Sequence, residues 1–249
     1  MKAIILAAGY ADKLYPLTKD QPKALLPVIG RPIINYLIDE IEKIQEIDEV
    51  FVVTNDEFED HFIRWEEEYQ FRSGLKITIV SNGTVSEENR HGAVADLGYC
   101  INKCEIRDDV LVVAGDTLIR FDLTKVLKDY LALGTDVVCG QRAKSGMDLS
   151  RFAIAKTDPD HFITELEEKP AKPKSNLIIY GLYFFERSTL PMVDEYLLNL
   201  HSPEYLGNFL EWLHIRKPLY VHVPDGDCID IDTLTDYADA QLKFSNQEE

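Results

Sequence analysis

A loop near the start of the chain carries residues suited to binding phosphate. An apolar run at residues 3–8 is followed directly by Gly9, and Lys23 lies further on between Pro22 and Pro27. Glycine lets backbone N–H groups approach a phosphate without a side chain in the way. A lysine close to prolines supplies a positive charge on a stiffened segment. These residues therefore indicate a phosphate-binding loop, although their spacing fits neither a GxGxxG dinucleotide loop nor a P-loop.

Carboxylates follow two further apolar segments of the chain. Asp116 comes after the apolar run 112–114 and Gly115, and Glu168 precedes Lys169 in a Glu-Glu-Lys-Pro run. An aspartate at the end of a strand can supply an oxygen ligand to Mg²⁺ or can simply cap a turn, and the residues alone leave both interpretations open. By itself, the Glu-Glu-Lys-Pro run is more typical of a solvated strand end than of a ligand site.

Apolar runs alternate with amphipathic helical patterns over the first 140 residues. This alternation is typical of a mostly parallel sheet with helices on both faces. We therefore expect an α/β fold, a single Rossmann-like domain of three layers with a mostly parallel, mixed sheet. The expected strands are 3–8, 50–55, 76–81, 109–114 and 136–140, and the expected helices are 32–44, 58–69, 91–103 and 123–133.

The pattern changes after residue 140. Shorter strands are expected at 152–156, 163–167, 177–185 and 219–223, with helices at 188–200, 204–215 and 234–244. Neither an internal repeat nor a long linker divides the chain. We therefore expect one domain over residues 1–249, with one lobe at about 1–140, a second at about 141–237 and a polar tail at 245–249.

The composition limits the classes of partner. The chain has 249 residues, of which 45% are hydrophobic, and a formal net charge of −18, so it can form one large α/β domain. So acidic a protein would be repelled by nucleic acids and by anionic membranes, and we expect neither as a partner. Its four cysteines lack CxxC spacing and are expected to stay reduced. With neither a signal peptide nor an apolar run near ~20 residues, we expect a soluble, cytoplasmic protein.

Three segments near the N-terminus closely resemble the signature of the sugar nucleotidylyltransferases. They are Leu-Ala-Ala-Gly at residues 6–9, Pro-Leu-Thr at 16–18 and Pro-Lys-Ala-Leu-Leu-Pro-Val at 22–28. The family pattern is roughly LAAG-x-G/A-T-R-L-x-P-L-T followed by P-K-x-L-x-P-V. The family includes glucose-1-phosphate thymidylyltransferase, UTP–glucose-1-phosphate uridylyltransferase and mannose-1-phosphate guanylyltransferase. The resemblance covers residues 1 to about 237 and implies a fold of the nucleotide-diphospho-sugar transferase type.

The resemblance also implies a reaction and a set of site residues. In the implied reaction, an NTP and a sugar 1-phosphate give an NDP-sugar and pyrophosphate, with Mg²⁺ as the cofactor. The first lobe would bind the NTP, and the second would bind the sugar phosphate. The residues implied are Lys13 and Lys23 for catalysis, Ala8, Gly9, Asn82, Gly83 and Gly92 for the nucleotide, Glu168, Lys169 and Gly181 for the sugar phosphate, and Asp116 and Asp230 for the metal.

The chain departs from the family pattern at several positions. Asp12-Lys13 stands where the family carries Thr-Arg, so the positive charge is kept but the planar, bidentate guanidinium is lost. Around Asp230 the family's tryptophan and glycine are missing, and Asp232 takes the place of the glycine. Ala153 replaces a glycine beside the expected sugar pocket. The glutamine and proline of the bacterial thymidylyl enzymes are also absent from the expected base-binding segment.

Two other functions stay open on the sequence. The departures at Asp12 and Lys13 are compatible with a relative that binds nucleotide or sugar phosphate without catalysis. A similar N-terminal loop occurs in cytidylyltransferases for non-sugar phosphates such as phosphocholine, although the Glu168-Lys169 element favours a sugar over choline, which calls for an aromatic cage. The sequence names neither the sugar nor the base, and the resemblance implies that a homo-oligomer can form.

Overall fold

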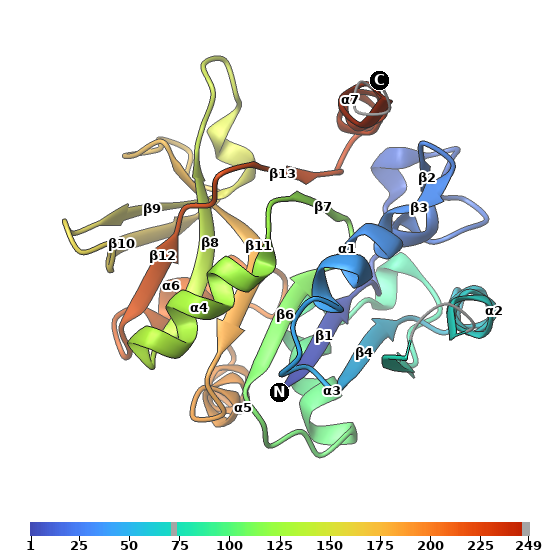
Figure 1. The fold of residues 1–249 in the computed structure, drawn as a ribbon, viewed down its shortest axis with the longest axis horizontal. Coiled ribbons are helices and arrows are strands. Elements are labelled where there is room, and N and C mark those ends of the chain that lie inside the picture. The colour runs from blue at the N-terminus through green and yellow to red at the C-terminus, as the bar shows by residue number, and fades with distance from the viewer. Residues whose placement is uncertain (71–73, 246–249) are drawn as a thin grey trace.

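A mixed β-sheet forms the centre of the protein (Figure 1). The computed structural model describes residues 1–70 and 74–245, and within them this sheet has nine strands. The first half of the chain supplies four parallel strands, β1 (Lys2–Leu6), β4 (Glu49–Thr54), β5 (Lys76–Ser81) and β6 (Val110–Ala114). The second half supplies β8 (Asp136–Arg142), β9 (Ala153–Thr157), β10 (Ile163–Glu168), β11 (Leu177–Phe185) and β12 (Leu219–His222).

The long strand β11 joins the two halves of the sheet. Along one edge it pairs with β9 through residues 177–179 and then with β6 through residues 182–185. Along its other edge it pairs with β8, with an irregularity between Ile179 and Tyr183. The strand order is β10-β9-β11-β6-β1-β4-β5, and β12 pairs with the far edge of β8. One continuous sheet therefore carries both the N-terminal strands and the later ones.

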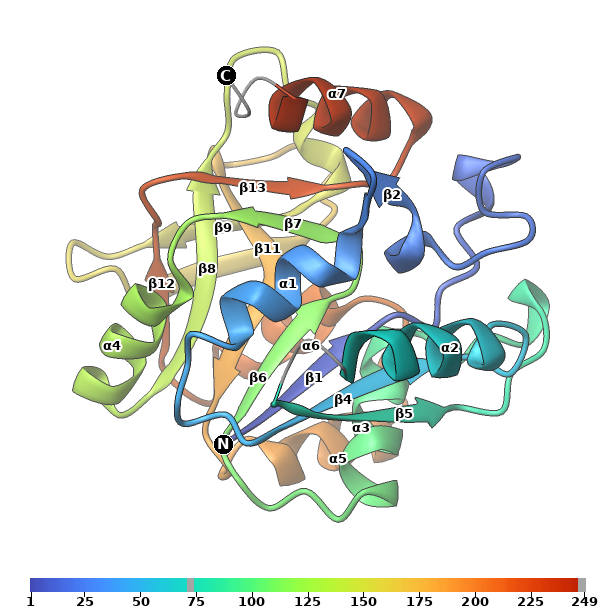
Figure 2. The ribbon, with the colours of Figure 1, turned by 45° about the vertical axis from the view of Figure 1, so that its right-hand side comes forward.

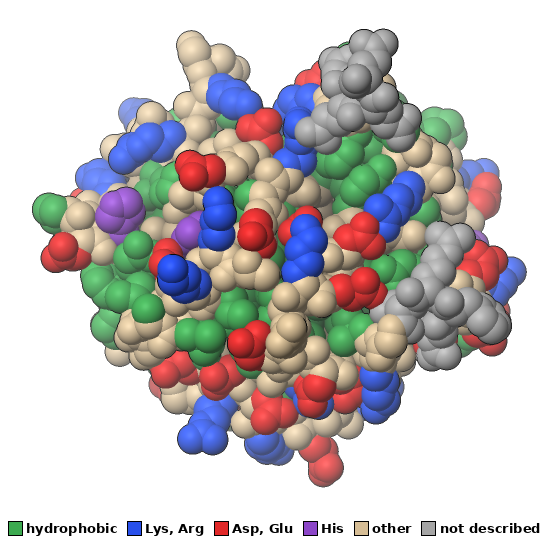
Figure 3. Space-filling model, in the orientation of Figure 1, with side chains coloured by type: hydrophobic (Ala, Val, Ile, Leu, Met, Phe, Trp, Pro, Cys, Tyr) green, Lys and Arg blue, Asp and Glu red, His purple; other side chains and the backbone are tan. Residues whose placement is uncertain are grey.

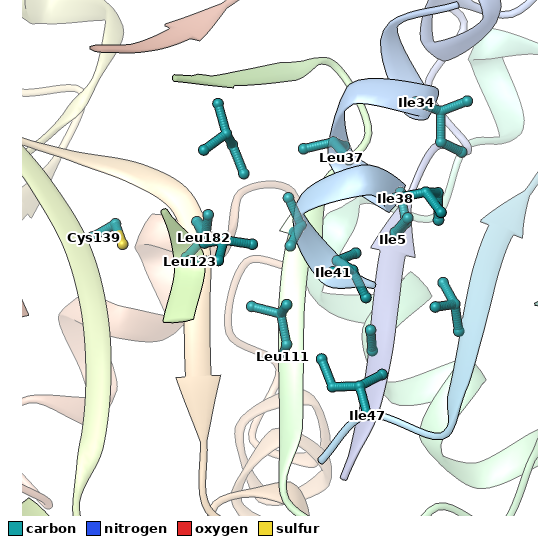
Figure 4. Close-up of a cluster of buried hydrophobic side chains, with 14 of the residues drawn as sticks. Ile5, Ile34, Leu37, Ile38, Ile41, Ile47, Leu111, Leu123, Cys139 and Leu182 are labelled. Atoms are coloured by element: carbon teal, nitrogen blue, oxygen red, sulfur yellow. The ribbon is translucent and has the colours of Figure 1, made fainter. Parts of the chain in front are cut away.

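Helices cover both faces of the sheet, as the alternation of strands and helices along the sequence predicts (Figures 1 and 2). In β1, Ile5 points into one core and Ile4 into the other, because successive side chains of a strand face opposite sides. The first core, drawn in part in Figure 4, receives α1 (Ile33–Ile41), α2 (Glu59–Gln70) and α4 (Leu123–Leu133). The second core receives α3 (Ala93–Lys103), α5 (Leu190–Leu198) and α6 (Leu206–Leu213).

A third, smaller hydrophobic cluster lies outside these two cores. It unites the N-terminal loop with two short strands, β7 (Thr117–Arg120) and β13 (Asp227–Asp230), and with the last helix, α7 (Leu234–Ser245). β7 and β13 pair antiparallel with each other, and another small ladder joins β2 (Pro27–Val28) to β3 (Arg31–Pro32). The buried members of this third cluster are Leu14, Leu26, Val28, Ile33, Leu118, Ile229, Ile231 and Ala240.

The structure confirms the expected α/β fold of three layers with a mostly parallel, mixed sheet. Every expected strand and helix is present, with ends displaced by at most three residues. The ladders β2–β3 and β7–β13 were not predicted, because strands of two to four residues are too short for alternation to stand out. The expected polar tail starts within α7, and residues 246–249 lie outside the described residues. The division into two lobes stays a prediction.

The surface shows how the acidic composition is distributed. On the face shown in Figure 3, acidic and basic side chains are interspersed rather than gathered by sign.

All four cysteines are free thiols, as expected, and Cys100, Cys139 and Cys228 are buried. None of the described helices combines the length and the apolar content needed to cross a membrane.

Candidate functional site

A cavity of about 530 Å³ lies beyond the carboxyl ends of β1 and β6, where ligands of open α/β sheets bind. The loops that follow these two strands form one wall, and residues of β10, β11, β13 and the start of α6 contribute to the rest. Of the residues expected at the site, all but Asn82 and Gly83 line it. They are Ala8, Gly9, Lys13, Lys23, Gly92, Asp116, Glu168, Lys169, Gly181 and Asp230.

The β7–β13 ladder brings Asp116 and Asp230 together across more than a hundred residues of sequence. Asp116 directly precedes β7, and Asp230 ends β13 opposite Thr117. The backbone N–H of Ile231 donates a hydrogen bond to the Asp116 carbonyl oxygen at 3.2 Å. Burial, together with the neighbouring Asp116 carboxylate, raises the pKa of Asp230. The two carboxyl groups therefore interact directly.

Lys23 neutralises part of this negative charge. Its Nζ forms an ion pair with the Asp116 carboxylate, and only 15% of the lysine side chain is exposed. Burial alone would lower the pKa of Lys23, but the carboxylates of Asp116 and Asp230 raise it above its ordinary value. With one lysine for two carboxylates, the cluster has room for a further positive charge.

Asp116 and Asp230 have the donor chemistry of a Mg²⁺ site. Mg²⁺ prefers carboxylate oxygens and is commonly held by one or two of them, with water and phosphate oxygens completing its shell. Over residues 1–70 and 74–245, no three His, Cys, Asp or Glu side chains converge on a metal site made by the protein alone. The pair therefore suits a cation that is shared with a phosphate ligand.

Asp232 links Lys13 to an arginine that the sequence analysis did not single out. Lys13 Nζ lies 3.2 Å from Asp232 Oδ2, and Arg151 Nη2 lies 3.6 Å from the same oxygen. Arg151 also contacts Asp236 Oδ2 at 2.8 Å. Burial alone would raise the pKa of Asp232, but Lys23 and Lys13 lower it overall. Lys13 and Arg151 thus add two positive charges to the cavity wall, and Arg151 brings the planar guanidinium that Lys13 lacks.

The Glu168-Lys169 pair lies where β10 ends, against the start of α6. A Cβ atom added at Gly207 would overlap Glu168 Oε2, so this carboxyl group lies directly against the α6 backbone. Burial raises the pKa of Glu168 from 4.5 to about 7, with opposing contributions from Lys169 and Glu211. Lys169 Nζ lies 3.2 Å from the centre of the Tyr205 ring, which is a cation–π contact. Tyr205 and Gly207 also line the cavity, and no sequence motif had marked them.

Two of the expected glycines are required by the packing of the chain itself. A Cβ added at Gly181 would lie 2.8 Å from the Cβ of Ala114 on the neighbouring strand β6. Gly92 has a φ of +91°, and a Cβ there would overlap the Pro203 backbone. The first two N–H groups of α3 donate to the carbonyl oxygens of residues 203 and 204, so they are already satisfied. The ligand contacts expected of both glycines stay predictions.

Asn82 and Gly83 do not line the cavity. Asn82 is buried, and its Nδ2 donates a hydrogen bond to Asp96 Oδ1 at 2.7 Å. Its Oδ1 accepts hydrogen bonds from both the backbone N–H and the hydroxyl of Thr84. Asp96, one helical turn after Gly92, lines the cavity instead. Its position one turn after Gly92 on the predicted helix was the sequence signal that could have identified Asp96 as a residue of the cavity wall.

Sequence comparisons find relatives over most of the chain. A family model described as "Nucleotidyl transferase" matches residues 2–247. The chain is 34% identical over 197 residues to a Sulfolobus acidocaldarius protein named "Putative mannose-1-phosphate guanyltransferase", and the match covers 78% of this chain and 51% of that protein. It is 28% identical over 187 residues to the UTP–glucose-1-phosphate uridylyltransferase AglF of Haloferax volcanii. That match covers 74% of this chain and 72% of AglF. The chain thus spans about half the length of the first of these relatives.

A solved structure shares the fold over nearly the whole chain. The structure of a UDP-glucose pyrophosphorylase complexed with UDP-glucose matches with a TM-score of 0.82, covering 99% of this chain and 98% of that one. The sequence identity is 19%, so this likeness establishes the fold. The expected fold of the nucleotide-diphospho-sugar transferase type is confirmed.

Glu168→Gln should change how stability depends on pH. The raised pKa means that the folded protein binds the Glu168 proton more tightly than the unfolded chain does. From about pH 4.5 to about pH 7 the wild-type free energy of unfolding should therefore fall as the pH rises, and glutamine removes this contribution. Urea unfolding at about pH 5 and about pH 8 measures the difference, with the exposed neighbour Glu167→Gln as the control. Equal pH dependence in wild type and Glu168→Gln would contradict the raised pKa.

Proposed function

The chain belongs to the nucleotidyl transferase family, and on that premise we propose that it is an active sugar-1-phosphate nucleotidylyltransferase. In this reaction a phosphate oxygen of the sugar 1-phosphate attacks the α-phosphorus of an NTP. The bond from that phosphorus to the bridging oxygen breaks, and pyrophosphate leaves. The observation that carries the proposal is that one cavity unites Asp116, Asp230 and Lys23 with Glu168 and Lys169. The names of the relatives, a guanyltransferase and a uridylyltransferase, support the same class of reaction.

The proposed nucleophile needs no strong general base. A phosphate monoester is already ionised near neutral pH, so catalysis depends on aligning the two substrates and on neutralising their charge. Among the described residues, a Cβ added at Gly9 would meet no atom within 4 Å, so the backbone beside Ala8 and Gly9 is open to a phosphate group of the NTP.

The charged residues at the end of β6 would neutralise the phosphates. Asp116 and Asp230 would hold Mg²⁺, which when bound supplies positive charge to the phosphate groups of both substrates. Lys23 is held beside them by its ion pair with Asp116 and would contact the triphosphate. Lys13 and Arg151 line the same cavity and would meet the charge that develops on the leaving pyrophosphate.

The residues around the end of β10 would bind the sugar phosphate. The Glu168 carboxyl group can accept hydrogen bonds from sugar hydroxyls, and its position against Gly207 limits the directions in which it can turn. Lys169 can bind the phosphate as a point charge, and its contact with the Tyr205 ring orients it. Substrate alignment in this proposal therefore depends on how the start of α6 packs against β10.

A matrix of NTPs against several sugar 1-phosphates and phosphocholine, read by pyrophosphate release with and without Mg²⁺, tests the proposed function. We expect at least one pair to release pyrophosphate, and only when Mg²⁺ is present. If no pair reacts, the proposal fails and a non-catalytic binding relative is favoured. If CTP with phosphocholine is the one reacting pair, the chain is a cytidylyltransferase for a non-sugar phosphate.

Lys23→Ala should lower kcat by roughly 10²–10³-fold, the usual effect of removing one group that stabilises transition-state charge. Lys19→Ala is the matched control, since Lys19 is exposed and does not line the cavity. Circular dichroism on both variants separates a loss of chemistry from a loss of folding. If kcat of folded Lys23→Ala equals that of wild type, Lys23 has no part in the reaction.

Gly207→Ala should raise the KM for the sugar 1-phosphate about tenfold, because the added methyl group displaces the Glu168 carboxyl group and weakens its hydrogen bonds to the sugar. The KM for the NTP should stay near its wild-type value. Gly74→Ala is the control, since a Cβ at Gly74 would lie more than 4 Å from the other described atoms, apart from those of its chain neighbours. An equal rise in both KM values would show that the start of α6 does not act through the sugar subsite.

A further inference from the structure

A chain of buried polar side chains runs from the loop after β1 to the first turns of α3. Tyr10 Oη donates a hydrogen bond to Thr84 Oγ1 at 3.2 Å, and the Thr84 hydroxyl donates to Asn82 Oδ1 at 2.8 Å. Asn82 Nδ2 then donates to Asp96 Oδ1 at 2.7 Å. All four residues are buried, and Tyr10 and Asp96 line the cavity. The network therefore holds the Asp96 carboxylate in a defined orientation at the cavity wall.

The Asp96 carboxylate has acceptor capacity to spare. An ionised carboxylate offers about four acceptor sites, and Asn82 is its one side-chain hydrogen-bond donor in the part of the chain that the structure describes. His91 Nδ1 lies 3.8 Å from Oδ1, beyond hydrogen-bonding distance. Burial raises the pKa of Asp96, because removing a carboxylate from water disfavours its charged form. N–H groups of a ligand in the cavity would supply the missing donors.

Asp96 lies on the part of the wall that the phosphate and sugar subsites leave unused. The cation that lines the cavity just before α3, Arg90, is already paired with Glu87 and with Glu204. A phosphate placed beside Asp96 would meet a like charge, and Arg90 already has two carboxylate partners. An uncharged group that presents hydrogen-bond donors fits this wall. The uncharged parts of an NTP are the ribose and the nucleobase, and of these the nucleobase can present rigid, coplanar N–H donors to a carboxylate.

We propose that Asp96 selects guanine, so that GTP is the nucleotide substrate; this inference rests on the proposed function. The Watson–Crick edge of guanine presents two adjacent donors, N1–H and the 2-amino group, which match the two oxygens of a carboxylate. Uracil and thymine present one N–H between two carbonyl oxygens, and these oxygens would face the carboxylate lone pairs. Adenine and cytosine present a ring nitrogen acceptor beside their amino group. Only guanine pairs both carboxylate oxygens without repulsion.

Steady-state pyrophosphate release by the full chain with GTP, UTP, dTTP, CTP and ATP tests this selection. Wild type should prefer GTP to UTP by at least about tenfold in kcat/KM, the discrimination expected of one bidentate base contact. Asp96→Asn replaces one acceptor oxygen by an amino group at the same size. It should reduce kcat/KM for GTP by about 10–100-fold and that for UTP by less than about threefold. The surface variant Asp108→Asn is the control and should leave both values unchanged.

The outcomes separate base selection from a purely structural role. If Asp96→Asn lowers kcat/KM equally for all nucleotides, Asp96 only supports the loop after β1, and the proposal is wrong. A wild-type preference for UTP or dTTP would also overturn it, while leaving the proposed function intact. If no nucleotide reacts, calorimetric binding of GTP and UTP decides: tighter binding of GTP supports the base selection although the proposed function fails, and equal or absent binding rejects it.

Discussion

The candidate site depends on the small hydrophobic cluster that joins the N-terminal loop to the β7–β13 ladder. Leu14, Leu118 and Ile231 are fully buried in it, and they come from three distant parts of the chain. Asp230 is the immediate neighbour of Ile231, so burial of the apolar side chain determines where the carboxylate lies. Two adjacent carboxylates repel each other, and burial together with this repulsion raises the pKa of Asp230. Burial of each large apolar side chain stabilises the fold by about 1.5–3 kcal/mol, and this burial opposes the repulsion between the carboxylates.

A second constraint comes from the segment between α5 and α6. Its backbone at Pro203 excludes any side chain at Gly92, at the start of α3. A few residues later, Tyr205 lies under Lys169 and Gly207 lies against Glu168. Residues 203–207 therefore contact the element expected to bind the nucleotide and the pair expected to bind the sugar phosphate. The two sides of the cavity are positioned by one short stretch of chain.

The parts of the site that the sequence predicted have signals that are local. Gly9 follows an apolar strand, and Lys23 lies near prolines. For both residues, the features that predict a ligand loop are therefore adjacent in the sequence. The strands β5 and β11 and the helix α4 also have local sequence signals, and each begins and ends at the predicted residue. By contrast, the direction of the Asn82 side chain depends on Asp96 and Thr84, which no local pattern couples to it. Arg151 likewise joins the site through tertiary contacts with Asp232 and Asp236.

Two departures from the family pattern, separate in the sequence, meet in the structure. Lys13 stands where the family has arginine, Asp232 stands where it has glycine, and their side chains form an ion pair at 3.2 Å. Both are partly exposed, with 63% and 36% of the side chain accessible, so the pair adds at most about 1 kcal/mol to stability. Its effect is on position instead: Asp232 contacts both Lys13 and Arg151, which draws a lysine and a guanidinium to the same edge of the cavity. The loss of the family arginine is thus accompanied by a carboxylate that gathers two other cations.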